Sequence, residues 1–477
     1  MRVDKVSQGT VIKDENPASG HLRELWTALG GASRFLDACG FGGSGDLISA
    51  FRVTDLATAA IGAAGIAAAE LLQASTGSLP AVHVDRRMAS LWFGTSLRPL
   101  GWTMPPQWDP IAGNYRARDR WIRLHTNAPH HRQAALSVLD CAADAKSVAH
   151  AVSRWEAHAL EDAVVARGGC AAVMYSRREW AEHPQGQAVA SEPLLHVHTE
   201  RRVATREWQP SRERPLRGIR VLDLTRILAG PVATRFLAGL GAEVLRIDPY
   251  GWEEPGTVPE VVLGKRCARL NLKDAADLDT LRQLLRGADI VVHGYRSDAL
   301  ARLGLDAAER RGLNPALIDV SLDAYGWSGA WRCRRGFDSL IQMSTGIAEA
   351  GMRAMRSDEP VSLPVQAIDH ATGYLMAAAA LRGLTKRMTQ GAGTEFRASL
   401  ARTAAVLQVR PERMSEVLEI AADTPRDRAG DVEQTSWGPA ARLLPPLAIE
   451  GAPLAWRYPA RALGEYEPEW LSSNEEL

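Results

Sequence analysis

Two aspartates open two runs of small apolar residues, where a carboxylate could do chemistry. Asp55 lies in FRVTDLATAAIGAAGIA (51–67) and Asp369 in VQAIDHATGYLMAAAAL (365–381). Such Ala-rich runs are typical of buried helices. A carboxylate at the mouth of a helix either caps it, because its charge suits the positive helix end, or acts as a nucleophile toward an activated acyl group. Taken singly, each residue favours the cap, since caps are far commoner than nucleophiles.

The two runs also resemble each other over a longer stretch. Placing Asp55 on Asp369, a shift of 314 residues (369 − 55), requires no gap as far as the glycines Gly77 and Gly391. An extended pattern follows each glycine, AVHVDRR in the first copy and TEFRASL in the second. The sequence therefore predicts the same order of elements in two places, and such a repeat must be settled before the fold is divided.

Composition narrows the class of protein. The chain has 477 residues, 46% hydrophobic and 23% charged, which suits two or three globular domains. Lys plus Arg and Asp plus Glu both number 56, so no net charge attracts nucleic acid or an anionic membrane. The start, MRVDKVSQGT, lacks the apolar stretch of a signal peptide, and the apolar run 56–69 is too short to cross a bilayer. We therefore expect a cytoplasmic protein that binds neither nucleic acid nor membrane.

The cysteine pattern also favours a cytoplasmic protein. They are odd in number, widely scattered, and in neither CxxC nor Cys/His spacing: Cys39, Cys141, Cys170, Cys267 and Cys333. This pattern predicts a reducing compartment, with no disulfide framework and no bound metal.

From residue 218 onward, strand and helix patterns alternate. Strands are predicted at 218–225, 242–248, 268–272, 289–295 and 316–322, and helices at 232–241 and 277–288. This alternation predicts an α/β fold with a doubly wound, mostly parallel, Rossmann-like sheet. Ligands on such sheets bind beyond the carboxyl ends of the strands, where the sequence has LAGP, DPYG and HGYR. A GxGxxG turn is absent, which argues against a nicotinamide-dependent oxidoreductase.

The same segment resembles the class III coenzyme A transferases, a family that also contains the α-methylacyl-CoA racemases. The resemblance covers 218–407 and rests on VLDLTRILAGPVATRFLAGLGAEVLRID, GKR, ADIVVHGYR, NPALIDVSL and IDHATG. The N-terminal half is similar less closely, through TDLATAAIG and the stretch from DRWIRLHT to EWAEHPQGQA. An Asp helix and a small domain thus come first, followed by a sheet domain, a second Asp helix and a tail. We interpret this order as a partial duplication.

This interpretation divides the chain into five parts. They are a partial transferase-like segment with an Ala-rich helix (1–112), a small α+β domain (113–200), an Arg-rich linker (201–217), a CoA-binding Rossmann-like large domain (218–407) and a C-terminal tail packing on the large domain (408–477). The first copy lacks its sheet domain and the second lacks its small domain. Only Asp369 therefore follows a complete sheet, and we expect Asp55 to be structural.

The resemblance implies that Asp369 is the catalytic nucleophile of a CoA transferase. Its carboxylate attacks an acyl-CoA thioester to give a mixed anhydride, and the thiolate returns to form an aspartyl thioester. An incoming carboxylic acid then takes over the CoA. The substrates are acyl-CoA and a carboxylic acid, and no permanently bound cofactor is required. We expect the helix N-terminus to keep the carboxylate ionised and to offer N–H donors to the developing oxyanion.

Coenzyme A carries a 3′-phosphate and a pyrophosphate, which need cations and backbone N–H groups. The candidates on loops after strands are Ala229, Gly230, Lys265, Arg266, Arg296, Arg302 and Arg335, with Arg334 beside the last.

Alternatives to a transferase remain open. One is a catalytically degenerate homologue that only binds acyl-CoA. Another is a racemase, which needs a second acid/base opposite the aspartate. Racemases of the family have a histidine where GFD places Phe337, and His370 lies about 100° round the helix from Asp369. The family forms interlocked homodimers, so we expect a homodimer or an equivalent arrangement within one chain.

Overall fold

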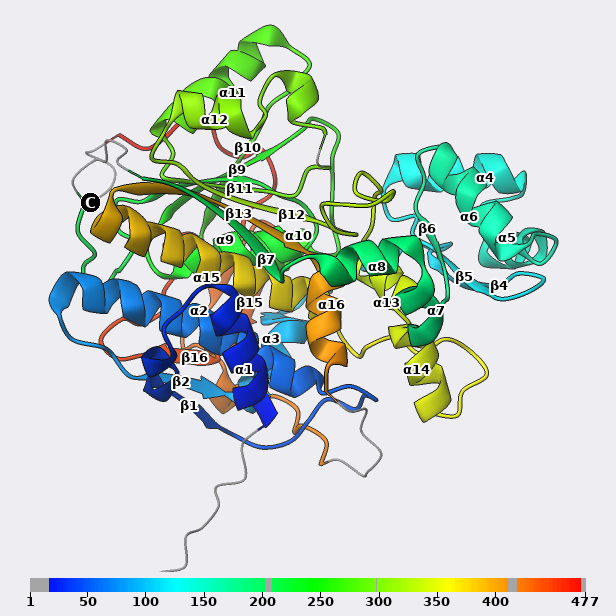
Figure 1. Cartoon of the computed structure of the whole chain (residues 1–477), viewed down its shortest axis with the longest axis horizontal. Helices are drawn as coiled ribbons and strands as arrows, with labels where there is room; N and C mark the ends of the chain where they lie inside the picture. Colours follow the sequence, from blue (N-terminus) through cyan, green and yellow to red (C-terminus); the bar gives the residue numbers. More distant parts are fainter. Residues whose placement is uncertain (1–16, 202–207, 297, 411–417, 473–477) are drawn as a thin grey trace, which may run out of the picture.

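A computed structural model describes residues 17–201, 208–296, 298–410 and 418–472. Its centre is a seven-stranded sheet in the order β10-β9-β8-β11-β12-β13-β7, parallel except for β7 (Figure 1). The strands are β8 (Arg220–Leu224), β9 (Glu243–Asp248), β10 (Lys265–Arg269), β11 (Ile290–His293), β12 (Ile318–Asp323), β13 (Ala392–Ser399) and β7 (Leu195–Arg201). The strand order reverses between β8 and β11, so the loops after these two strands flank the point where ligands bind in such sheets.

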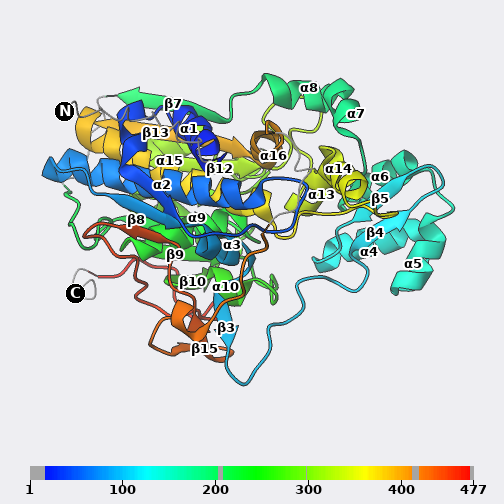
Figure 2. The same cartoon turned by 90° about the horizontal axis from the view of Figure 1, so that it is seen from below.

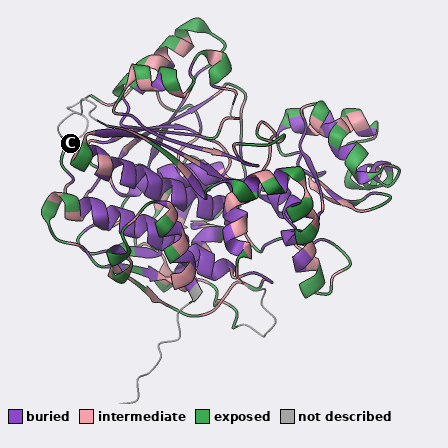
Figure 3. Cartoon of the chain, viewed as in Figure 1, coloured by how far each residue is buried: buried purple, intermediate pink, exposed green. Residues whose placement is uncertain are grey.

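Helices cover both faces of this sheet, which confirms the predicted α/β, doubly wound fold. One face carries α11 (Ala275–Gly287) and α12 (Ala307–Leu313), and the other carries α9 (Ala229–Gly239) and α15 (Ala367–Gln390) (Figure 1). A further layer lies beneath α15, made of α2 (Val53–Thr76) and then α1 (Pro17–Ala28) (Figures 1 and 2). Both long helices are buried along nearly their whole length (Figure 3). The core therefore runs from the sheet through two helical layers.

A smaller unit lies to one side of the large sheet (Figure 1). It contains the antiparallel sheet of β4 (Gly113–Arg116), β5 (Trp121–Leu124) and β6 (Ala171–Val173), with α4 (Pro129–Leu139), α5 (Ala145–Val152) and α6 (Ala157–Ala166). The helices α7 (Arg177–Glu182) and α8 (Pro184–Ser191) lead back to the large sheet. Because β7 pairs with β13, the end of the predicted small domain 113–200 is the edge strand of the large sheet.

The elements of the two similar runs repeat at the predicted shift. Helices α2 and α15 have 24 residues each, and Gly77 and Gly391 end them with positive φ angles of 78° and 58°. Next come β2 (Val82–Asp85) with α3 (Arg86–Gly94), and β13 with α16 (Leu400–Gln408). The flanking strands also correspond. A parallel neighbour and an antiparallel neighbour enclose each central strand: β1 (Cys39–Gly42) and β16 (Leu447–Ile449) enclose β2, as β12 and β7 enclose β13.

The C-terminal tail contacts the N-terminal segment as well as the large domain. Strand β16 pairs with β2, and β15 (Gly438–Arg442) lies between β14 (Glu433–Thr435) and β3 (Leu97–Pro99). Trp470 donates to the carbonyl of Leu284 in the large domain. The tail 408–477 was predicted to pack on the large domain, and its described residues contact both that domain and the N-terminal segment. Of the predicted linker 201–217, residues 202–207 lie outside the described residues.

Helix α2 is longer than the apolar run 56–69 indicated. By length and composition alone it could cross a membrane, with a mean hydropathy of 1.5 over its most apolar window. Within the fold, 94% of that window is buried, against α1 and α15 among other elements.

Candidate functional site

Asp369 lies in the first turn of α15, but it does not cap the helix. The N-cap is Gln366, so Asp369 is the third helical residue, and Asp55 is likewise third after the N-cap Arg52. Neither N-cap residue accepts a hydrogen bond through its side chain. The simple capping interpretation is therefore wrong for both aspartates, and each carboxylate needs another explanation.

Two cavities meet at Asp369, whose side chain is almost completely buried. The first, of about 340 Å³, lies at the carboxyl ends of the strands, and the second, of about 490 Å³, lies between the large domain, α3 and the small unit. Both are lined by Asp369, Phe337, Ile227 and Leu228. The carboxylate is thus positioned to react with a group that passes from one cavity into the other.

A second carboxylate, Asp338, holds the beginning of α15 in place. It is the first residue of α13 (Asp338–Ser344), and its Oδ2 accepts the backbone N–H groups of Ile368 and Asp369, both at 2.9 Å. The Gln342 side chain donates to its other oxygen. Burial raises the pKa of Asp338 to about 6. Burial and then the Asp338 charge raise the pKa of Asp369 well above its ordinary value.

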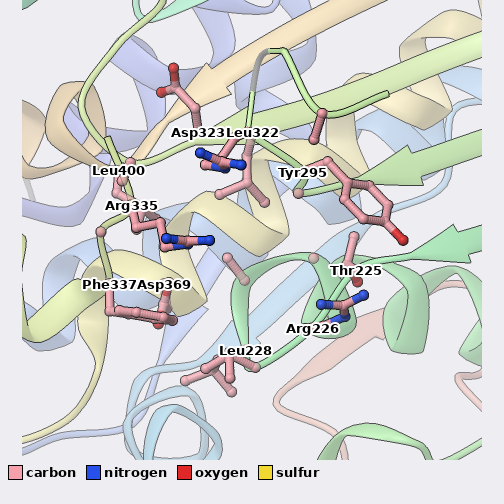
Figure 4. Close-up of a pocket in the computed structure, with 18 of the residues that line it drawn as sticks. Thr225, Arg226, Leu228, Tyr295, Leu322, Asp323, Arg335, Phe337, Asp369 and Leu400 are labelled. Atoms are coloured by element: carbon pink, nitrogen blue, oxygen red, sulfur yellow. The ribbon is translucent and has the colours of Figure 1, made fainter. Parts of the chain in front are cut away.

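The first cavity is strongly basic. Five arginines line it: Arg226, Arg296, Arg332, Arg334 and Arg335. Arg334 is committed to an ion pair with Glu161 at 2.9 Å. Arg226 lies over the ring of Trp252, and Arg335 donates to the carbonyl of Gly168. Figure 4 shows Arg226 and Arg335 on opposite sides of this cavity, with Asp369 and Phe337 on the side of Arg335. Such a wall suits phosphate groups.

Four of the seven predicted CoA contacts line this cavity, namely Ala229, Gly230, Arg296 and Arg335. Arg302 does not line it. Its side chain is exposed and pairs with Asp298.

Lys265 and Arg266 also lie elsewhere, because β10 begins at Lys265, three residues before the predicted strand 268–272. Their side chains therefore belong to the sheet and not to a loop. The Lys265 ammonium is fully buried and donates to Asp223 and to the Pro231 carbonyl, both at 2.9 Å. Arg266 pairs with Glu243 and donates to the carbonyl of Glu469.

The second cavity contains residues that the sequence reasoning missed. Arg123 and His125 reach it from β5 and the residue after it, and Trp108 lies beside them. His125 stacks on Phe337 with ring centroids 3.8 Å apart, and its Nδ1 lies 3.3 Å from the Ser339 hydroxyl. Burial holds the pKa of His125 well below its usual value, so its ring is neutral. The alternation of DRWIRLHT was the available signal, because Arg123 and His125 fall on one face of that strand.

Asp55 has very different surroundings. Its buried carboxylate pairs with Arg86 and also lies 3.6 Å from Arg52, and it lines neither cavity. A carboxylate held between two guanidinium groups is a structural ion pair. In the described part of the chain, no group of three or more His, Cys, Asp or Glu side chains is arranged to hold a metal ion.

Comparison with known proteins identifies what this arrangement resembles. Residues 216–436 match the family described as CoA-transferase family III. An acyl-CoA transferase of Gibberella moniliformis is 31% identical over 268 residues, which cover 52% of this chain and 46% of the relative. Human succinyl-CoA:glutarate CoA-transferase is 31% identical, with 38% of this chain and 44% of the relative covered. The chain thus spans about half the length of the curated relatives it matches.

A solved structure gives a similar match. The crystal structure of Rv3272 from Mycobacterium tuberculosis is 31% identical and has a TM-score of 0.38, with 41% of this chain and 58% of that chain covered.

Proposed function

Residues 216–436 of this chain belong to CoA-transferase family III, and from this membership we propose that the protein moves CoA from an acyl-CoA thioester to a carboxylic acid. The observation that carries the proposal is the position of Asp369 where a cavity lined by five arginines meets a second cavity of about 490 Å³. Coenzyme A places its phosphates against Arg226, Arg296 and Arg335. The acyl group enters the second cavity, and the thioester carbon then lies at the carboxylate.

The reaction proceeds through two bonds to Asp369. Its carboxylate oxygen attacks the thioester carbon, the C–S bond breaks, and the products are a mixed anhydride and CoA thiolate. The thiolate attacks the aspartyl carbonyl, which releases the first acid and leaves an aspartyl thioester. The acceptor carboxylate repeats these steps in reverse order and leaves as its CoA ester. Burial of Asp369 excludes the water that would hydrolyse the anhydride.

The N-terminal turn of α15 does not supply the oxyanion donors that the sequence suggested. The N–H groups of Ile368 and Asp369 donate to Asp338, that of Ala367 to Val365, and that of His370 to Gln366. All four are therefore committed. Any donors to the oxyanion must therefore come from other residues that line the cavities.

Trapping the intermediate tests this function directly. Incubating the protein with succinyl-CoA and with butyryl-CoA, quenching with hydroxylamine and mapping peptides by mass spectrometry should place a hydroxamate on Asp369. The Asp369→Asn variant serves as the control, because it keeps the shape of the site but cannot form the anhydride. CoA binding with no adduct from either thioester would instead identify a degenerate, binding homologue.

A racemase is the second candidate, and one observation favours it. His125 lines the same cavity as Asp369, although Phe337 occupies the place of the family histidine. Its neutral ring could accept a proton but is poorly prepared to return one, because its pKa is so low. Exchange of the α-hydrogen of 2-methylbutyryl-CoA in D₂O, measured by NMR, separates the two chemistries. We expect no exchange.

The way the second cavity is built bears on the expected homodimer. Phe93 and Thr95, at the end of α3 and just beyond it, line the second cavity together with residues of the large domain. One chain therefore supplies walls on both sides of Asp369. We propose that any homodimer joins two such sites, and sedimentation of the 51.8 kDa chain alongside an activity assay tests whether a monomer is active.

A further inference from the structure

Arg123 lines the second cavity, and the proposed transfer reaction gives it no role. Its side chain extends from β5 into the cavity and lies over the ring of Trp108, 4.8 Å from the centroid. One terminal nitrogen donates to Asn114 at 2.9 Å, and Nε has no hydrogen-bond partner in the described structure. Among the described residues, no carboxylate forms an ion pair with this guanidinium.

Removing a guanidinium group from water lowers the stability of the fold unless an anion pairs with it. Burying a charge without a counter-ion is unfavourable by several kcal/mol, so buried arginines are normally paired. Arg123 is half-buried, and the more deeply buried arginines of this fold follow that rule. Arg246 pairs with Asp248 and Glu254, and Arg310 pairs with Asp319.

The remaining cavity wall suits a small acid better than a phosphate. It combines apolar side chains with neutral polar ones, whereas five arginines suited to phosphates line the first cavity. The apolar side chains include Phe93, Met104, Trp108, Leu363 and Val365, and the polar ones include Gln107 and Asn127. Asp338 and Asp369 already bring negative charge to the junction of the cavities. An entering anion therefore needs a cation to offset this charge, and Arg123 is close enough to Asp338 for the two charges to interact.

We propose that Arg123 binds a second carboxylate of the substrate, so that the preferred acids carry one carboxylate for transfer and another for recognition. This inference rests on the proposed transferase function. It applies equally to the acyl group of the donor and to the acceptor acid, because both occupy the second cavity in turn while bound to Asp369. Arg123 would then determine specificity without touching the reacting atoms.

Matched pairs of acids test the proposal. Glutarate and pentanoate have the same number of carbons and differ in the second carboxylate, as do succinate and butyrate. For the unmodified protein we expect kcat/KM to favour the dicarboxylate of each pair by about 100-fold, the effect of one buried charge pair. Arg123→Met should remove this preference, and Arg123→Lys should retain part of it.

The controls separate recognition from structure. Arg116→Met removes an exposed arginine on the neighbouring strand β4, which lies over Trp121 and lines neither cavity. It should leave the ratio unchanged. A purely structural role of Arg123 would lower kcat/KM for both acids of a pair alike. That result, or a weaker affinity of Arg123→Met for CoA itself, would overturn the proposal.

A binding measurement keeps the test independent of catalysis. Titration calorimetry of glutarate and pentanoate into protein saturated with CoA should show the same preference, and the same loss in Arg123→Met. If the protein binds glutarate more tightly than pentanoate but transfers no CoA, the proposed role of Arg123 stands and only the transferase function is overturned. Equal binding of the two acids by the unmodified protein would overturn the Arg123 site.

Discussion

The backbone N–H of Asp369 donates to the Asp338 carboxylate at 2.9 Å, so two buried carboxyl groups share the beginning of one helix. Asp338 holds the turn that carries Asp369, and at the same time its charge raises the pKa of Asp369. The arrangement orders Asp369, the proposed nucleophile, and makes its charged form less stable. A less stable carboxylate is a better nucleophile, because less energy is lost when its charge passes to the thioester.

Asp369→Asn should abolish transfer and stabilise the fold at neutral pH. The amide cannot form the anhydride, so we expect turnover to fall by about three orders of magnitude or more. The pKa of Asp369 is higher in the folded protein than in the unfolded chain, so ionisation of this group destabilises the fold. This destabilisation is absent at low pH and grows as the pH rises toward the folded-state pKa. Removing the charge should therefore raise Tm by about 1–3 °C at pH 7.5 and by less at pH 4. Scanning calorimetry at both pH values with a transfer assay checks this, and near-normal transfer would contradict the mechanism.

Asp55→Asn should give the opposite pair of results. Its carboxylate is fully buried between Arg86 and Arg52, so the amide removes the charge that both guanidinium groups face and leaves Arg86, among the described carboxylates, with only its pair to Asp46. We expect a loss of about 2–3 kcal/mol in the free energy of unfolding and little change in the turnover of the folded protein. Urea unfolding and the transfer assay provide the measurements. A folded but inactive Asp55→Asn variant would show that the catalytic copy has been misassigned.

Asp338→Asn should shift the pH dependence of transfer. The nucleophile must be ionised, so kcat/KM rises with pH through the raised pKa of Asp369 and is lost in acid. Removing the neighbouring carboxylate lowers that pKa, so the acidic limb should move to lower pH. The amide oxygen can still accept the N–H groups of Ile368 and Asp369. The companion variant is Gln342→Leu, which removes a donor that lowers the pKa of Asp338. Asp338 then carries less negative charge, so the limb should again move to lower pH, but by less than in Asp338→Asn. An unchanged limb in both variants would exclude coupling of the two carboxyls.

The fold could be predicted from the sequence because its signals are local. The strands β8, β9 and β11 each lie within a predicted apolar run, β12 extends one residue beyond its run, and the repeat placed both Asp helices. The start of strand β10 was predicted three residues too far along the chain, because charged residues such as Lys265 and Arg266 are typical of loops. The partner that makes burial of Lys265 possible is Asp223, 42 residues earlier, and a local pattern does not reveal it.

The site was harder to predict because distant segments build it. Asp369 and four loop residues, which the matching motifs predicted, line the cavities. Arg123 and His125 belong to the small unit, which packs beside Asp369 only after folding. Asp338 was visible in the GFD triplet, but its bonds to the first turn of α15 depend on the packing of two helices.

Arg335 and Lys265 should have different roles, one in binding CoA and the other in stabilising the core. Arg335 is half-buried, lines the basic cavity and has one hydrogen bond to a backbone carbonyl, so Arg335→Met should weaken CoA binding about 10-fold while Tm changes little. Lys265→Met should do the reverse. It leaves the Asp223 carboxylate buried without its ammonium partner, which costs about 3 kcal/mol of stability, while CoA affinity of the folded protein is unchanged. Titration calorimetry with CoA and urea unfolding of both variants make the comparison. Weaker CoA binding in Lys265→Met at full folding, with none in Arg335→Met, would mean that CoA does not occupy the cavity at the strand ends.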